Sequence, residues 1–124
     1  MDAATRGLVR ERAGNQCEFC GLPQEAEAFF TFHIEHIIAQ QHGGGDTPEN
    51  LALACYHCNL HKGTNLTGID AQSGELVRLY HPREQPWTEH FRRNGDVIEG
   101  RTAVGRVTVS LLKMNAADRR RLRG

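Results

Sequence analysis

Aromatic side chains are scarce in this sequence, and long hydrophobic segments are missing. Aromatic residues make up 6% and hydrophobic residues 39% of the chain, and no apolar run approaches the ~18 residues that suggest a membrane-spanning helix. The segment from Met1 to Gly14 lacks the apolar core of a secretory signal, so we expect a cytoplasmic protein without membrane contact. Its length suits one modest domain, and such a domain often gains stability from a metal or from disulfides.

The chain also lacks net charge, which by itself does not favour nucleic-acid binding, but its charges are unevenly distributed. Residues 1–62 hold four Lys or Arg against eight Asp or Glu, a balance of −4, and residues 63–124 hold eleven against seven, a balance of +4. A basic half can contact phosphates while an acidic half binds cations. A solvated helix end is the other interpretation of the terminal arginine run, which comprises Arg119, Arg120, Arg121 and Arg123.

Residue patterns in the first half predict short helices and one strand. Residues 4–13 fit a helix, and residues 29–38, rich in β-branched and aromatic side chains, fit a strand. Asp46 or Thr47 fits a helix N-cap, which predicts a short helical turn that continues through residues 50–54. A further helix is expected to begin at residue 59.

The second half reads as an extension of the first. Residues 75–80 alternate like a strand, and residues 87–93 and 97–102 flank Asn94-Gly95, a strong hairpin signal. A closing helix is predicted from residue 103 to residue 112 or 122. This extension can dock on DNA phosphates, cover an edge of the first half or mediate dimerisation.

The four cysteines form two Cys-x-x-Cys pairs, Cys17 with Cys20 and Cys55 with Cys58. This spacing lets both thiolates of a pair reach one metal, and four thiolates suit the tetrahedral geometry of a structural zinc. In a reducing compartment, paired cysteines indicate a metal rather than disulfides. An iron–sulfur cluster and two redox-active pairs are the alternatives. Zinc would close a loop of 34 residues between Cys20 and Cys55.

Polar residues concentrate in and just after this loop. Phosphodiester cleavage needs a hard oxygen ligand for a cation such as Mg²⁺ and a neutral imidazole that takes a proton from water. A carboxylate next to a histidine offers both, and an asparagine can add a carbonyl oxygen. The residues concerned are His33, Glu35, His36, His42, Asn50 and Asn59.

The order of these motifs resembles the HNH endonucleases. The shared motifs are Cys17-x-x-Cys20, Glu35-His36-Ile37-Ile38, Gly43-Gly44, Glu49-Asn50-Leu51, Cys55-x-x-Cys58-Asn59 and Lys62-Gly63. The resemblance implies an α+β fold with a small ββα-metal core over residues 10–63, stapled by a four-cysteine zinc site. Residues 64–124 would add a basic β-hairpin and helix within a single domain, 1–124.

The resemblance also implies roles for individual residues. His36 matches the general base that activates water, and Glu35 matches the acidic ligand of the catalytic metal, where aspartate is more usual. Asn50 matches the asparagine that braces the loop and orients the base. Asn59 replaces the final histidine of the motif, so the chain is an H-N-N variant whose oxygen ligand favours Mg²⁺ or Mn²⁺. Gly63 stands where some members carry a further histidine ligand.

Three residues have less defined roles. His33 is expected to support the metal or bind phosphate, or else to pack in the sheet. His42, in a glycine-rich loop, is expected to be exposed and able to touch the substrate. Lys62 is expected either to neutralise a phosphate or to be solvated.

The leading hypothesis is a metal-dependent endonuclease that acts on DNA, with RNA as a possible substrate. The alternative is a non-catalytic zinc module that binds nucleic acid or a protein. Such a module would keep the four cysteines and tolerate the loss of Glu35, His36 and Asn59, all of which are present.

Overall fold

The computed structural model describes residues 1–124 and divides into two units, Met1–Thr64 and Asn65–Gly124. Each unit combines short helices with antiparallel strand pairs, so the fold is α+β, as predicted. None of the helices has the length and apolar character that crossing a membrane would require.

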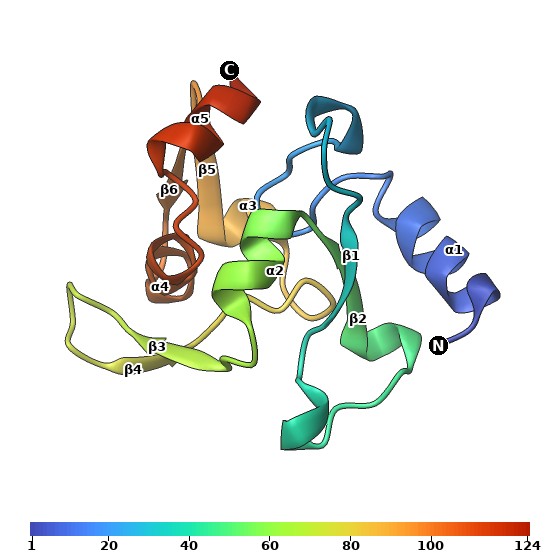
Figure 1. Ribbon diagram of the computed structural model, residues 1–124. Helices are drawn as coiled ribbons and strands as arrows, with labels where there is room; N and C mark the ends of the chain where they lie inside the picture. The colour runs from blue at the N-terminus through green and yellow to red at the C-terminus, as the bar shows by residue number, and fades with distance from the viewer. The chain divides into compact units, whose positions relative to one another are not determined.

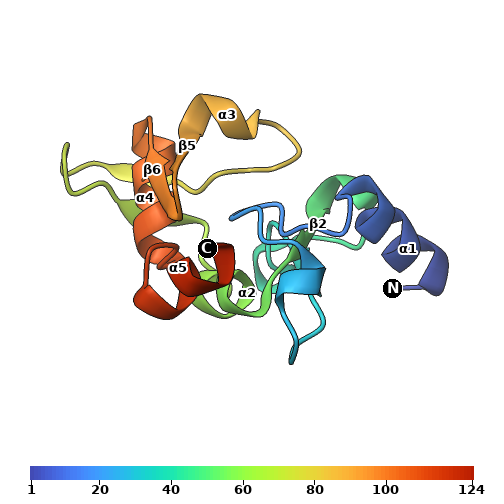
Figure 2. The same cartoon turned by 90° about the horizontal axis from the view of Figure 1, so that it is seen from above.

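The N-terminal unit is built on a β-hairpin with a helix on either side of it. Strands β1 (His33–His36) and β2 (Leu51–Ala54) pair antiparallel. Helix α1 (Ala3–Arg12) contacts β2, and helix α2 (Tyr56–Lys62) contacts both strands. Figures 1 and 2 show the hairpin between these two helices. The arrangement β1–β2–α2 is the ββα core that the resemblance implied.

Strand β2 corrects a prediction, because a helical turn was expected over residues 50–54. The turn is limited to the 3₁₀ helix Pro48–Asn50, and the next four residues, Leu-Ala-Leu-Ala, form a strand that is fully buried. Leu and Ala favour helix in isolation, but tertiary burial and pairing with β1 override that preference.

Strand β1 is shorter than the predicted 29–38. The side chain of Gln24 accepts a hydrogen bond from the Phe32 amide at 2.8 Å and donates one to the Phe30 carbonyl at 3.0 Å. These backbone groups are thus satisfied outside the sheet ladder, and the strand begins only at His33.

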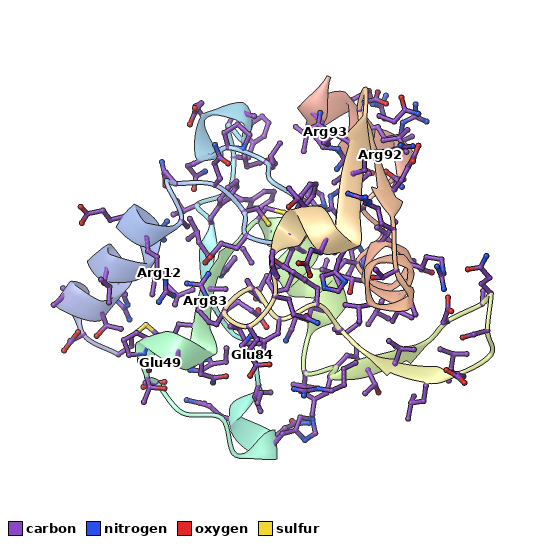
Figure 3. The ribbon with its side chains drawn as sticks, turned by 180° about the vertical axis from the view of Figure 1, so that it is seen from behind. Arg12, Glu49, Arg83, Glu84, Arg92 and Arg93 are labelled. Carbon is purple, nitrogen blue, oxygen red and sulfur yellow. The ribbon has the colours of Figure 1, made fainter.

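Helix α1 confirms the prediction over residues 4–13. Its N-cap, Asp2, accepts a hydrogen bond from the Thr5 amide at 2.8 Å. At its other end, Arg12 donates to the carbonyls of Pro48 at 3.1 Å and Leu51 at 2.7 Å. Figure 3 shows Arg12 directed toward the segment that carries Glu49. Arg12 therefore ties α1 to the start of β2.

The C-terminal unit contains two hairpins that contact the same helix, α4. Strand β3 pairs with β4, and β5 pairs with β6. A Cβ on Gly105 would lie 1.9 Å from the His90 carbonyl oxygen, so only glycine lets α4 approach this closely. The elements are β3 (Thr67–Ile69), β4 (Leu76–Arg78), α3 (Trp87–His90), β5 (Phe91–Asn94), β6 (Val97–Gly100), α4 (Ala103–Leu111) and α5 (Ala117–Arg123).

The predicted hairpin around Asn94-Gly95 is confirmed in β5 and β6, with Asn94 opposite Val97 and Gly95 at φ 63°. Residues 87–90 are helical rather than extended. The closing helix ends at Leu111, and α5 begins only at Ala117.

Most side chains of the terminal arginine run bond to groups within the C-terminal unit. Arg119 is buried and donates to the carbonyls of Leu112 and Lys113, where α4 ends. Arg120 pairs with Asp96 at 3.0 Å, and Arg123 donates to the Asp96 carbonyl at 2.8 Å. On β5, Arg92 pairs with Glu99 at 2.6 Å; Figure 3 labels Arg92 and its neighbour Arg93.

Asp70 is the centre of a hydrogen-bonded cluster in the C-terminal unit. Its carboxylate, in a residue 1% exposed, accepts bonds from Arg106 Nε at 3.0 Å and Nη2 at 2.9 Å and from Ser73 Oγ at 2.8 Å. The bonds from Arg106 and Ser73 hold the Asp70 pKa well below its usual range. Because the folded-state pKa is depressed, the stabilisation is present above the unfolded pKa of about 4 and is lost as pH falls toward the folded value.

We expect unfolding of this unit to become easier as pH falls below about 4, and Asp70→Asn to weaken the unit at neutral pH while flattening that dependence. Urea titrations at pH 6 and pH 3, followed through the single tryptophan, Trp87, measure both effects. Equal pH dependence in wild type and Asp70→Asn would show that Asp70 is not the group responsible.

Candidate active site and metal centre

The four cysteines converge at one buried point of the N-terminal unit. Their Sγ atoms all lie within 4.8 Å of one another. Each pair has the same local geometry: the Cys20 amide points at Cys17 Sγ at 3.5 Å, and the Cys58 amide points at Cys55 Sγ at 3.4 Å. Cys55 is also the N-cap of α2. The site therefore joins the segment before β1 to the start of α2.

The spacing of the sulfur atoms fits zinc. Four ligands at a Zn–S distance of about 2.3 Å place tetrahedral sulfurs about 3.8 Å apart, and Cys20 Sγ lies 3.7 Å from Cys55 Sγ. That separation is far too long for a disulfide, which needs about 2.05 Å. Burial raises the pKa of the Cys17 and Cys58 thiols, and a bound cation reverses this effect because it binds the thiolate. The buried four-cysteine cluster is consistent with a structural zinc site.

A second feature of the same unit is an open pocket of about 420 Å³ between β1 and α2. Glu35 and His36 reach it from β1, and Asn59 reaches it from α2. Glu35 is the only carboxylate in its lining. The other lining residues are Ile34, Ala39, Gln40, Gln41, Gly63 and Thr64.

His36 is held by a partner that the sequence did not indicate. Its Nε2 lies 2.7 Å from Asp46 Oδ1, and the two side chains are 25% and 47% exposed. A carboxylate only accepts hydrogen bonds, so Nε2 is the donor of this bond, and in a neutral ring the lone pair would lie on Nδ1. The hydrogen bond from His36 also holds the Asp46 pKa below its usual range.

Asn50 braces the loop between β1 and β2. Its Oδ1 accepts from the Ile38 amide at 2.8 Å, and its Nδ2 donates to the carbonyls of Ile38 at 3.0 Å and Gly45 at 2.9 Å. A Cβ on Gly44 would fall 1.7 Å from the Ile38 oxygen and 2.8 Å from Asn50 Nδ2, so this crossing admits only glycine. The brace brings Asp46, in the same loop, within reach of His36.

Lys62 lies inside the unit rather than on its surface. Its Nζ, in a side chain 2% exposed, donates to Glu35 Oε1 at 3.0 Å and to the carbonyls of Ile37 at 2.9 Å and His36 at 3.4 Å. Burial raises the pKa of the Glu35 carboxyl, and Lys62 offsets part of that rise. Lys62 is therefore a buried hydrogen-bond donor and counter-ion of Glu35, and it does not face the solvent.

The structure separates the remaining candidates from the pocket. His33 is exposed at the start of β1, opposite Ala54, and is not part of the pocket lining. His42 is exposed at the end of the 3₁₀ helix Gln40–His42. The sequence did not predict Asp46 as the partner of His36, because no residue pattern links a loop residue to a strand residue ten positions earlier. The only sequence feature that could have indicated it is the acidic side chain directly after the glycines of this loop.

Comparison with protein families identifies this unit. The model of the HNH endonuclease family matches residues 17–65, from the first cysteine to just beyond α2. Residues 17–65 are an HNH endonuclease domain. No curated protein and no solved structure matches the chain. The HNH match spans both cysteine pairs and every residue that lines the pocket, so the family and the geometry point to the same part of the chain.

An HNH endonuclease domain suggests nuclease activity and implies DNA as the partner. The residues that the sequence resemblance assigned to the motif, His36, Asn50 and Asn59, all lie within the matched range.

Proposed function

We propose that the HNH domain is a metal-dependent endonuclease that hydrolyses phosphodiester bonds of DNA. The observation that supports this most strongly is the shared pocket of Glu35, His36 and Asn59, because α2 brings Asn59 beside two residues more than twenty positions earlier. A carboxylate and an amide oxygen that can hold a cation, together with an imidazole that can act as a base, line this one pocket, and the reaction needs these groups.

In this proposal His36 is the general base. Asp46 holds the proton on Nε2, so Nδ1 can accept a proton from the attacking water as its oxygen forms the new bond to phosphorus. The imidazolium that results is stabilised by the Asp46 carboxylate. The bond from phosphorus to the leaving oxygen breaks, that oxygen takes up a proton from solvent water, and His36 later returns its proton to solvent.

Glu35 and Asn59 are the residues that would hold the catalytic metal. They offer one carboxylate and one amide oxygen, hard donors that suit Mg²⁺ or Mn²⁺, which retain several waters when protein ligands are few. Such a cation polarises the scissile phosphate and stabilises negative charge on the leaving oxygen. A zinc in the four-cysteine cluster, in contrast, would have four protein ligands and would serve the fold.

Asn50 acts on the reaction indirectly. Its three hydrogen bonds set the loop that carries Asp46, and Asp46 sets the ring of His36. We therefore assign Asn50 a positioning role. The C-terminal unit, with its excess of basic residues, is proposed to add contacts to DNA phosphates.

The test is cleavage of supercoiled plasmid, linear duplex, branched DNA and RNA by the zinc-loaded full chain with Mg²⁺ or Mn²⁺. We expect plasmid nicking or linearisation that EDTA stops and that weakens steeply with added salt. Binding of DNA without cleavage under any of these conditions would instead favour a non-catalytic zinc module.

A further inference from the structure

Glu35, which lines the pocket that would hold the catalytic metal, belongs to a buried ion pair. Lys62 Nζ lies 3.0 Å from Glu35 Oε1, and the two side chains are 2% and 7% exposed. The remaining bonds of the ammonium go to the carbonyls of Ile37 and His36, so its three protons are all in use. The Lys62 side chain is therefore fixed, because moving it away from Glu35 would break its hydrogen bonds to Glu35 Oε1 and to the two carbonyls.

In this pair, the Lys62 ammonium offsets most of the negative charge of Glu35, which would otherwise attract a cation. Glu35 is the only carboxylate of the pocket lining, and Lys62 lies directly behind it. A cation held by Glu35 and Asn59 would be repelled by the Lys62 ammonium, which lies 3.0 Å from Glu35 Oε1. In a partly buried site such repulsion is weakly screened.

We propose that Lys62 is an internal counter-ion that keeps the DNA-free pocket weak for divalent cations, so that the scissile phosphate completes the metal site. This inference rests on the proposed function for the identity of the phosphate. A phosphate oxygen supplies both the missing charge and a hard ligand. Metal binding and DNA binding then strengthen each other by the same factor. The nuclease is thereby kept largely free of its catalytic metal until DNA is present.

The test measures Mn²⁺ binding through the loss of the free-ion electron paramagnetic resonance signal. All proteins are zinc-loaded full chains that carry His36→Ala, which keeps the DNA intact, and zinc content is checked in each. An additional Asn59→Ala substitution defines binding outside the pocket, because Asn59 lines the pocket from the surface of α2. Each protein is titrated with Mn²⁺ alone and with a short DNA duplex.

With Lys62 present, we expect the duplex to tighten pocket binding of Mn²⁺ by at least about tenfold. Lys62→Gln, which keeps a hydrogen-bond donor without the charge, should bind Mn²⁺ at least about tenfold more tightly without DNA, and the gain from DNA should shrink. Lys62→Arg, which keeps the charge, should retain the weak DNA-free binding.

Equal Mn²⁺ affinity with and without DNA would overturn the inference, whether or not the Lys62 variants fold. So would a Lys62→Gln protein that keeps its zinc and binds Mn²⁺ no more tightly than its parent. This experiment measures Mn²⁺ binding and not cleavage. A lack of nuclease activity in the plasmid assay would therefore count against the proposed function without deciding the Mn²⁺-binding result.

Discussion

Replacing Cys55 by serine should unfold the N-terminal unit and abolish cleavage. A structural zinc held by four cysteines contributes on the order of 10–16 kcal/mol of apparent binding free energy in small zinc domains, which matches or exceeds the total stability of a typical domain. The N-terminal unit has only a hairpin of two four-residue strands and short helices to hold it. Serine can still cap α2 as Cys55 does, so the loss would report the metal and not the cap.

Zinc content, near-ultraviolet circular dichroism and the thiolate charge-transfer band of the cobalt-substituted protein measure this effect. His57→Ala is the matched control, since His57 lies between the same two cysteines and is not part of the sulfur cluster. The control should keep zinc and fold. A Cys55→Ser protein that stays folded and cuts DNA would show that the cysteine site is dispensable.

Replacing His36 by alanine should abolish most cleavage while sparing the fold. Removal of a general base typically costs about 10²–10⁴-fold in rate. The side chain is partly exposed and its ring bonds to the half-exposed Asp46, so its loss leaves no deeply buried group unsatisfied. Single-turnover cleavage of plasmid, with zinc content and circular dichroism compared to wild type, separates the chemical effect from a folding defect.

Asp46→Asn refines this prediction. An amide can donate as well as accept, so it fixes the tautomer of His36 less well than the carboxylate does. We expect a loss of rate smaller than that of His36→Ala, without a change in zinc content. His57→Ala again serves as the control and should cut at the wild-type rate. If His36→Ala cuts as fast as this control, His36 is not the base.

The sequence predicted the metal centre more completely than the local structure around it. The spacing of two Cys-x-x-Cys pairs favoured one zinc over an iron–sulfur cluster or two redox-active pairs, and the structure brings Cys17, Cys20, Cys55 and Cys58 together at one buried point. The order of motifs likewise placed Glu35, His36 and Asn59 in one region, and the structure brings them to one pocket. Their catalytic roles remain proposals.

The local structure was harder to predict where tertiary contacts decide it. Residues 51–54 favour helix by composition but form the buried strand β2. Lys62 resembled a surface lysine because nothing in its neighbours signals a buried partner 27 residues earlier, Glu35. The arginine run offered two interpretations, and the structure shows Arg119 buried, with its guanidinium bonded to the carbonyls of Leu112 and Lys113.

The central claim is that one metal shapes the site and a second performs the chemistry, and metal readdition tests it most directly. Wild-type protein is loaded with one zinc per chain, freed of other divalent cations and mixed with supercoiled plasmid, and Mg²⁺ or Mn²⁺ is then added. The account predicts no cleavage with zinc alone and cleavage that rises with the added cation while the zinc content stays constant. Full cleavage by the zinc-only protein, or no cleavage at any concentration of Mg²⁺ or Mn²⁺, would contradict it.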